Sequence, residues 1–310
     1  MSDSGNKPTA GFSVFWRMLR PHTLSASFVP VAVGSAYALK ATGLFAPGRA
    51  LLMLAACLFI QIATNLFNEY YDYVRGLDTR DSVGIGGTIV RDGLSPRFVM
   101  AAALGFYAAA AGLGLTLAAL SSPLLLPIGA LAMLCGYLYT GGPYPIAASP
   151  FGEAAAGLLL GSLVIGLSFF LQTGYVGAAV FFISLPVALL IAAILTANNI
   201  RDREGDAAGG RRTLVILLGH RRSVRFLAAL FALAALWSAG LCLRSGFGFW
   251  FLLPFLSLPS AWRAVRLFQR SENAPPAVML PAMRHTAQTN TIYGLAYAAA
   301  LLLAAFFPAG

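Results

Sequence analysis

Charged residues are scarce in this sequence. Of its 310 residues only 10% are Asp, Glu, Lys or Arg, whereas 58% are apolar and the mean hydropathy is +0.76. Soluble domains carry roughly 25% charged residues. A chain this apolar cannot cover itself with polar side chains, which excludes an ordinary soluble domain and makes lipid the expected solvent.

Cysteine and histidine are also few, with three of each. Cys57, Cys135 and Cys242 lie inside apolar runs and lack the spacing of disulfide frameworks or of zinc sites. No Ser/His/Asp or Cys/His set for nucleophilic catalysis can be picked out. The sequence therefore argues against a soft-ligand metal centre and against covalent catalysis by a serine or cysteine.

Acidic residues are outnumbered by basic ones, and the net charge is +10. The basic residues lie in short segments between apolar runs, where they orient a protein in a membrane and do not indicate nucleic acid. With a cytoplasmic N-terminus, only Lys40, Arg49 and Arg244 fall outside, and the other 18 of the 21 Lys and Arg fall inside. This asymmetry predicts a topology in which the C-terminus lies outside, and the expected location is the bacterial cytoplasmic (inner) membrane.

Apolar runs long enough to span a bilayer, about 20 residues each, recur along the chain. They predict an all-α integral membrane protein with about nine transmembrane helices. We expect a single domain over residues 1–310, with a flexible cytoplasmic tail at residues 1–16. The runs are Thr23–Leu39, Leu51–Tyr70, Phe98–Leu120, Leu124–Tyr139, Ala154–Leu171, Gly177–Ala197, Val224–Leu243, Phe249–Phe268 and Thr286–Phe307.

Two cytoplasmic connections, residues 71–97 and 198–223, are long and charged, whereas the outside connections are short. Long charged loops on a compact membrane protein are candidates for function. Eight of the 11 acidic residues belong to these two regions or to the helix ends beside them. Both connections are therefore candidates for a functional site.

Asparagine and acidic side chains form a row in each region. If the helices continue into these regions, each row falls within an arc of about 100°. The first row is followed by Asp78. The rows are Asn65, Asn68, Glu69 and Asp72 in the first region, and Asn198, Asn199, Asp202 and Asp206 in the second.

Both rows lie at helix C-termini, which carry partial negative charge. Crowded carboxylates also repel one another, so the rows are unfavourable unless a cation joins them. Oxygen-only ligands favour Mg²⁺, which typically completes its shell with substrate phosphate oxygens. The expected metal ligands are Asn68, Glu69, Asp72, Asp202 and Asp206, with help from Asp78.

Arginines lie among these rows and could bind a diphosphate through bidentate contacts. Tyr139, beside a Gly-Gly-Pro turn, is a further candidate for substrate binding. The same charges could instead be solvated loop residues, and a secondary transporter would be a different class of protein. A transporter should carry its charges near the bilayer midplane, whereas these gather at one surface. The substrate-binding candidates are Asn65, Asn68, Arg75, Arg91, Asn198, Asn199, Arg201 and Arg212, with Arg80, Arg203 and Arg211 also available.

The pattern Asn65-x-x-Asn68-Glu69-x-x-Asp72, paired with Asp202-x-x-x-Asp206, resembles the two Asp-rich motifs of the UbiA superfamily of intramembrane prenyltransferases. Further stretches resemble the branch that prenylates 1,4-dihydroxy-2-naphthoate (the MenA branch). The likeness extends across most of the chain. These stretches are Leu19–Leu24, Val83–Gly87, Ile89–Gly93, Tyr137–Pro145, Asn198–Asp202 and Gly210–Leu214.

The resemblance implies a UbiA-type bundle around a central cavity, which the two long cytoplasmic connections cap. It also places Mg²⁺-bound diphosphate beneath this cap. It also implies transfer of a polyprenyl group from polyprenyl diphosphate to 1,4-dihydroxy-2-naphthoate, with loss of CO₂ and diphosphate. The product would be demethylmenaquinone, a precursor of menaquinone. The catalytic residues would be Asp72, Asp78, Asp202 and Asp206, with Asp78 as a candidate proton acceptor.

One departure bears on the acceptor. The related 4-hydroxybenzoate branch usually carries a Tyr-x-x-x-Lys pattern, whereas Tyr139 is followed here by Thr-Gly-Gly-Pro143 without a lysine. This difference counts against hydroxybenzoate and leaves another aromatic or lipid acceptor as the alternative. Arg20 and Arg91 are the candidates for binding an aromatic carboxylate.

Overall fold

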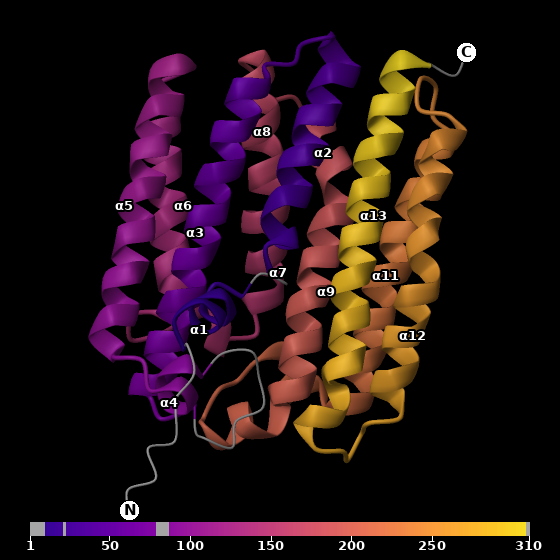
Figure 1. Cartoon of the computed structure of the whole chain (residues 1–310). Coiled ribbons are helices and arrows are strands. Elements are labelled where there is room, and N and C mark those ends of the chain that lie inside the picture. The colour runs from indigo at the N-terminus through magenta and orange to yellow at the C-terminus, as the bar shows by residue number, and fades with distance from the viewer. Residues whose placement is uncertain (1–9, 21–22, 79–86, 308–310) are drawn as a thin grey trace, which may run out of the picture.

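The computed structural model describes residues 10–20, 23–78 and 87–307, and every regular element in these ranges is a helix. The long helices run side by side in one bundle (Figure 1). The short helix α1 (Ala10–Met18) lies at one end of the bundle, and the last helix ends at the opposite end (Figure 1). The all-α architecture predicted from the sequence is confirmed.

Each of the nine predicted apolar runs coincides with a helical segment of the described residues. Three segments combine more than one type of helix, because a π-helix (η3) or a 3₁₀-helix (η4, η5) joins an α-helix end to end. The segments are α2 (Ser25–Thr42), α3 (Pro47–Val74), α5 (Pro96–Leu120), α6 (Leu125–Thr140), α7–η3–α8 (Gly152–Ala156, Gly157–Leu163, Val164–Thr173), α9 (Ala178–Ala208), α11 (His220–Cys242), η4–α12 (Phe249–Ser257, Leu258–Gln269) and η5–α13 (Pro276–Met279, Leu280–Phe306).

Six of these segments are long and apolar enough to cross a membrane by length and composition: α3, α5, α7–η3–α8, α9, α11 and η5–α13. The helix α6 is apolar but shorter. The chain is therefore an integral membrane protein, and the count of nine spans stays a prediction.

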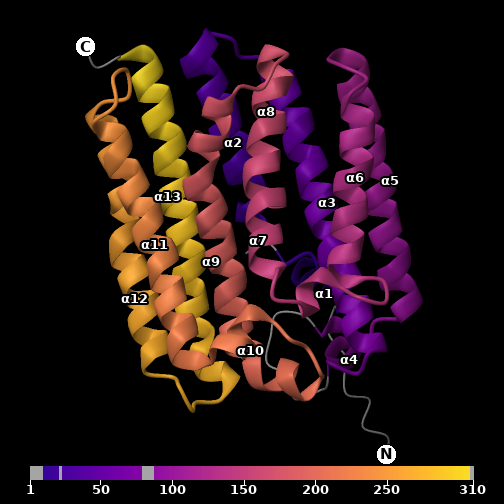
Figure 2. The ribbon, with the colours of Figure 1, turned by 180° about the vertical axis from the view of Figure 1, so that it is seen from behind.

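The end of the bundle beside α1 is closed by short elements (Figure 2). These are α4 (Thr88–Asp92), η2 (Ile146–Ala148) and α10 (Leu214–Leu218). The two connections predicted as long loops are shorter than expected, because α3 continues to Val74 and α9 to Ala208. Each helix continues until a glycine in the left-handed region follows it, Gly76 at φ 69° and Gly210 at φ 79°. Both polar rows therefore stand on regular helix.

Buried apolar side chains of the described residues form three clusters. The largest buried core joins α2, α8, α9, α11, α12 and α13. A smaller cluster joins α3 and α5 to α1 and α4 through residues such as Leu66, Phe67 and Val99. Small residues bring helices close together: a Cβ added at Gly161 of η3 would lie 2.7 Å from the Cα of Ala188 in α9.

Gly161→Ala should therefore destabilise the protein by about 1–3 kcal/mol, the usual cost of overpacking a core. Gly166→Ala, one to two turns along the same segment, is the matched control because a Cβ there meets no atom of the described residues within 4 Å. Thermal unfolding of the two variants in detergent measures the difference. Equal midpoints for both variants would show that η3 and α9 separate easily.

Candidate active site

A cavity of about 480 Å³ lies between α2, α3, α5, α6, the α7–η3–α8 segment and α9. Polar side chains line its end beneath the short helices, among them Asn68, Tyr139 and Asn198. Its lining extends along α3 to Met53, fifteen residues or about 22 Å of helix from Asn68. Apart from the polar end the lining is mostly Ala, Leu, Ile and Met. The π-helix η3 contributes Leu159, Leu160 and Leu163, and such irregular turns are frequent at functional sites.

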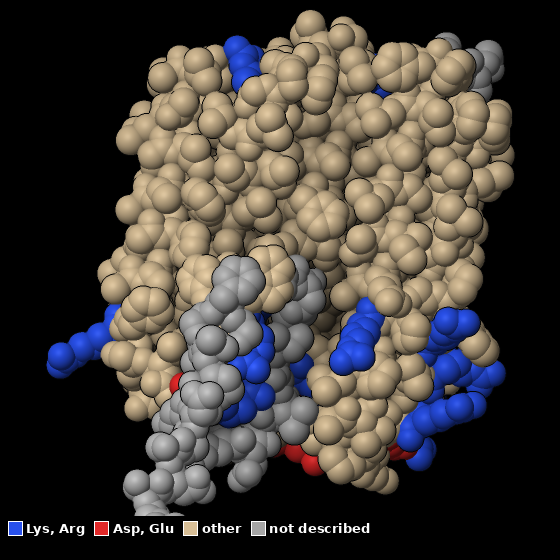
Figure 3. Space-filling model, viewed as in Figure 1, with Lys and Arg blue, Asp and Glu red and all other residues tan. Residues whose placement is uncertain are grey.

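Charge gathers at the same end of the molecule. The face in Figure 3 is almost uncharged across its middle, and most of the visible Lys, Arg, Asp and Glu lie toward the end that carries α1 and α4. An apolar belt of this kind suits contact with lipid. The polar end of the cavity therefore opens under the charged end of the protein.

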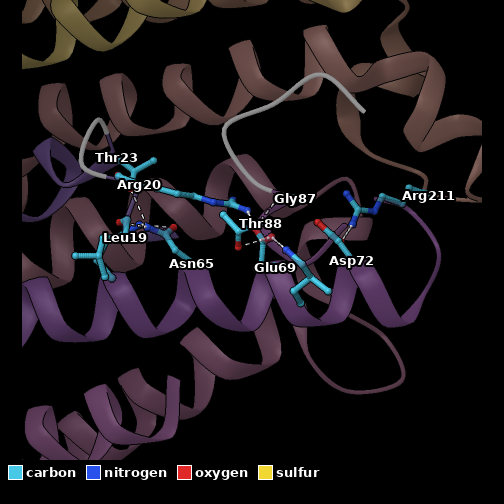
Figure 4. Close-up of polar contacts among 11 residues, drawn as sticks. Leu19, Arg20, Thr23, Asn65, Glu69, Asp72, Gly87, Thr88 and Arg211 are labelled. Carbon is cyan, nitrogen blue, oxygen red and sulfur yellow. Dashed lines mark hydrogen bonds and ion pairs between the residues drawn. The ribbon is translucent and has the colours of Figure 1, made fainter. Parts of the chain in front are cut away.

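The two predicted acidic rows meet there through one arginine. Asp72 Oδ1 on α3 accepts a hydrogen bond from Arg211 Nη2, and Asp206 Oδ1 on α9 accepts one from Arg211 Nη1 at 2.9 Å. Figure 4 shows the Arg211 side chain reaching Asp72. The side chains of all three residues are at most 18% exposed. Carboxylates from helices far apart in the sequence thus share one cation.

The chain after α9 explains how Arg211 reaches both carboxylates. The left-handed Gly210 turns the chain back, so that the Arg211 backbone N–H donates to the Asp206 carbonyl at 2.9 Å. A Cβ at Gly209 would come within 2.3 Å of Leu77, which follows α3. The ends of α3 and α9 are therefore in close contact.

Burial alone would lower the pKa of Arg211, but the neighbouring carboxylates of Asp72 and Asp206 outweigh it and raise that pKa. The Arg211 guanidinium is therefore charged. Asp78 lies close by, with its backbone N–H directed at the Asp72 carbonyl at 3.4 Å. Burial, together with the charges of Asp72 and Glu69, raises the pKa of Asp78 to about 6.

Glu69 is held by protein groups. Its carboxylate accepts hydrogen bonds from Arg20 Nη2 at 2.9 Å, from the backbone N–H groups of Gly87 and Ile89 at 2.9 and 3.3 Å, and from Thr88 Oγ1 at 3.0 Å. The side chain is only 2% exposed, and Figure 4 shows it between Arg20 and the start of α4. In this arrangement Glu69 anchors the N-terminus of α4, and its predicted role as a metal ligand stays a prediction.

The asparagines divide into two kinds. Asn68 and Asn198 line the cavity. Asn65 also borders the cavity, but its amide donates to Thr23 Oγ1 at 3.0 Å and joins α3 to the start of α2. Asn199 is buried and donates to Glu153 Oε1 at 2.8 Å, which joins α9 to α7.

The predicted arginines also have different surroundings. Arg75 donates to the carbonyls of Thr140 and Gly142 at 2.7 and 2.9 Å and so caps the C-terminus of α6, directly beside Tyr139. Arg201 pairs with the adjacent Asp202 and contacts the Met283 sulfur at 3.1 Å.

The remaining arginines border the cap. The Arg212 backbone N–H donates to the Ala148 carbonyl after η2 at 2.9 Å. Arg91 lies on α4 with its side chain close to Gly87. Arg80 falls outside the described residues.

Tyr139 is the single aromatic side chain among the described residues that line the cavity. Its hydroxyl is buried and makes no hydrogen bond within the described part of the chain. The same holds for Thr140 Oγ1, Glu153 Oε2 and Arg20 Nε. Buried polar atoms without partners are costly, so these atoms are poised for a polar ligand or for water.

Sequence reasoning overlooked two features of this site. It offered Arg211 only as one of several arginines, because nothing in a sequence tells which of them reaches two carboxylates. It also gave no role to Glu153, whose side chain is buried. A lone carboxylate at the start of an apolar run is a signal that could have found it.

The donor set fits Mg²⁺. Within the described ranges no three His, Cys, Asp or Glu side chains converge on a ready-made metal site. Two carboxylates, Asp72 and Asp206, do converge on the Arg211 guanidinium. The Asn68 amide lies one helical turn from Asp72. Mg²⁺ is usually bound by one or two carboxylates together with substrate phosphates, so a partial oxygen site of this kind suits it.

These observations define an integral membrane protein with a long apolar cavity, whose polar end lies near two carboxylates that share one arginine. The chain belongs to the UbiA prenyltransferase family, whose pattern matches residues 27–287. It is 48% identical over 296 residues to a 1,4-dihydroxy-2-naphthoate octaprenyltransferase of Bacillus subtilis, covering 94% of this chain and 93% of the relative. The enzyme of the same name from Mycobacterium tuberculosis is 32% identical, covering 94% and 98%.

A solved structure has the same fold. The UbiA homolog from Archaeoglobus fulgidus bound to GPP and Mg²⁺ matches with a TM-score of 0.66 over 93% of this chain and 99% of that chain. The sequence identity is 19%, so the likeness concerns the fold. The UbiA-type bundle predicted from the two acidic motifs is therefore confirmed.

Proposed function

We propose that this prenyltransferase moves a polyprenyl group from polyprenyl diphosphate to 1,4-dihydroxy-2-naphthoate, releasing CO₂ and diphosphate. The product is demethylmenaquinone, and the pathway is menaquinone biosynthesis. The observation that carries the proposal is the 48% identity, over almost the whole chain, to an enzyme named for this acceptor. The long apolar cavity with a polar mouth supports a substrate that has a hydrocarbon tail and a charged head.

Mg²⁺ is the proposed cofactor, and when bound it neutralises the charge that develops on the departing diphosphate. Asp72 and Asp206 are its proposed carboxylate ligands, with Asn68 beside them. Asp202 and Glu69 remain candidates whose side chains would have to leave their present partners, Arg201 and Arg20. The arginines of the cap, Arg91 and Arg212 among them, bind the outer diphosphate oxygens in this proposal.

The prenyl tail lies along the apolar lining toward Met53 and Leu171. This lining mainly excludes water, because water would react with the allylic cation left when diphosphate departs. Tyr139 alone provides an aromatic face among the described lining residues. Saturated side chains therefore carry most of the shielding.

The acceptor ring lies near Tyr139 and Arg20 in this proposal. Arg20 lines the cavity and has a buried Nε without a hydrogen-bond partner in the described residues, which suits an aromatic carboxylate. Asp78 is the proposed proton acceptor for a phenolic hydroxyl, since a carboxyl with a pKa of about 6 is ionised at neutral pH but retains some basicity. Its neighbour Asp81 lies outside the described residues.

The orientation in the membrane belongs to the same proposal. The charged end of the bundle faces the cytoplasm, where polyprenyl diphosphate and the aromatic acid are supplied, and the end of α13 faces outward. The support is the distribution of Lys and Arg along the sequence, with 18 of 21 on one side.

One assay tests the proposal. Membranes that contain the protein are given a polyprenyl diphosphate and, in separate reactions, 1,4-dihydroxy-2-naphthoate, 4-hydroxybenzoate or a glycerol lipid. We expect prenylated product and released CO₂ with the naphthoate alone, loss of activity in EDTA and recovery with added Mg²⁺. Transfer to another acceptor would favour the alternative branch of the family, and full activity in EDTA would refute the metal.

A further inference from the structure

The most unusual contact at the mouth of the cavity is the pair of carboxylates on Arg211. Asp72 and Asp206 each bond a different terminal nitrogen of the same guanidinium. The two carboxylates therefore share a single positive charge. The arginine thus occupies the electrostatic position of the proposed Mg²⁺.

We propose that Arg211 is a resident counter-cation, which neutralises Asp72 and Asp206 until a divalent metal displaces it and which then pairs with the diphosphate. This inference rests on the proposed function, because it takes the two carboxylates to be metal ligands. Without a cation, two facing carboxylates in a partly buried site would repel each other.

The local backbone allows such a movement. Arg211 follows Gly209 and Gly210, and a Cβ at Gly210 would meet no atom of the described residues within 4 Å. Among the described residues, the Arg211 side chain forms hydrogen bonds and ion pairs with these two carboxylates alone. Rotation of its long side chain can therefore release both partners without breaking a packed core.

The arrangement makes metal binding and substrate binding support each other. A metal alone must compete with a guanidinium that already bonds both carboxylates, so its affinity is reduced. A metal that arrives with a diphosphate offers the displaced guanidinium a new anionic partner with bidentate geometry. The site therefore favours the metal–diphosphate pair over the free metal.

The test measures binding of Mn²⁺ alone, as a probe for the divalent site, to the full-length protein in detergent. Arg211→Gln should bind Mn²⁺ about tenfold more tightly, because each 1.4 kcal/mol of removed competition is tenfold. Arg221→Gln is the matched control, since it removes the same charge from an exposed pair with Glu272, outside the cavity lining. Its affinity should change by less than about threefold. Arg211→Lys retains the charge and should stay near the wild-type value.

The same substitution should change the affinity for diphosphate in the opposite direction. With Mg²⁺ at saturation, Arg211→Gln should bind inorganic diphosphate about tenfold more weakly, because a charge-assisted pair is lost. If Arg211 had only a structural role, its substitution would weaken the binding of both Mn²⁺ and diphosphate, or of neither. Unchanged or weaker Mn²⁺ binding by Arg211→Gln, while the wild type binds Mn²⁺, would overturn the inference alone. Absence of Mn²⁺ binding in every variant would overturn the proposed metal site as well.

Discussion

Asp72→Asn should lower the rate of prenyl transfer by a factor on the order of 10²–10³, the usual cost of removing one group that stabilises transition-state charge. Asparagine retains the shape of the side chain but removes the negative charge that would hold the metal. Asp72 lies on α3 beside Arg211 and one turn from the cavity-lining Asn68. The loss should therefore fall on the chemical step and on metal affinity.

The measurement is the rate of product formation in membranes at saturating prenyl donor and acceptor, with Mg²⁺ titrated. Glu272→Gln is the control, because it makes the same carboxylate-to-amide change in an exposed pair with Arg221, outside the cavity lining. Its rate should match the wild type. If Asp72→Asn kept a rate within threefold of the wild type at every Mg²⁺ concentration, Asp72 would not be part of the site.

Glu69→Ala should have the largest effect on stability, about 3–5 kcal/mol, which is the range for removing one member of a buried ion pair. The substitution leaves the Arg20 guanidinium, only 15% exposed, without its carboxylate. It also leaves the backbone N–H groups of Gly87 and Ile89 without an acceptor. We expect the start of α4 to detach from α3.

Denaturant unfolding in detergent measures this cost, and hydrogen exchange over residues 87–92 should show faster exchange in the variant. Glu204→Ala is the matched control, because its side chain is 79% exposed and should contribute less than about 0.5 kcal/mol. Mn²⁺ affinity of the folded Glu69→Ala protein should stay close to that of the wild type. Unchanged stability together with lost Mn²⁺ binding would instead make Glu69 the metal ligand that its sequence pattern suggests.

These two variants separate residues that look alike in the sequence. Glu69 and Asp72 lie three positions apart in one row, and both were predicted as metal ligands. In the structure the Glu69 carboxylate is enclosed by backbone and side-chain donors, and the Asp72 carboxylate faces α9 across Arg211. Helical periodicity places both on one arc, but it does not say which neighbours stand opposite that arc.

The same limit applies to the second row. Asp206 reaches across to α3 through Arg211, whereas Asp202 is paired with the arginine beside it in the sequence. Asn198 lines the cavity, while its neighbour Asn199 turns toward a buried Glu153. A rotation of about 100° per residue separates such neighbours, so partners on other helices decide their roles.

The sequence by itself determined the membrane class, the nine apolar segments and the two rows of oxygen ligands. It could do so because hydropathy, charge asymmetry and helical spacing are local properties of the chain. Only the tertiary structure decided that α3 and α9 meet at their polar ends, that Arg211 joins their carboxylates and that Glu69 anchors α4. The Glu69–Gly87 and Asp72–Arg211 contacts link residues 18 and 139 positions apart, and they depend on how the bundle packs.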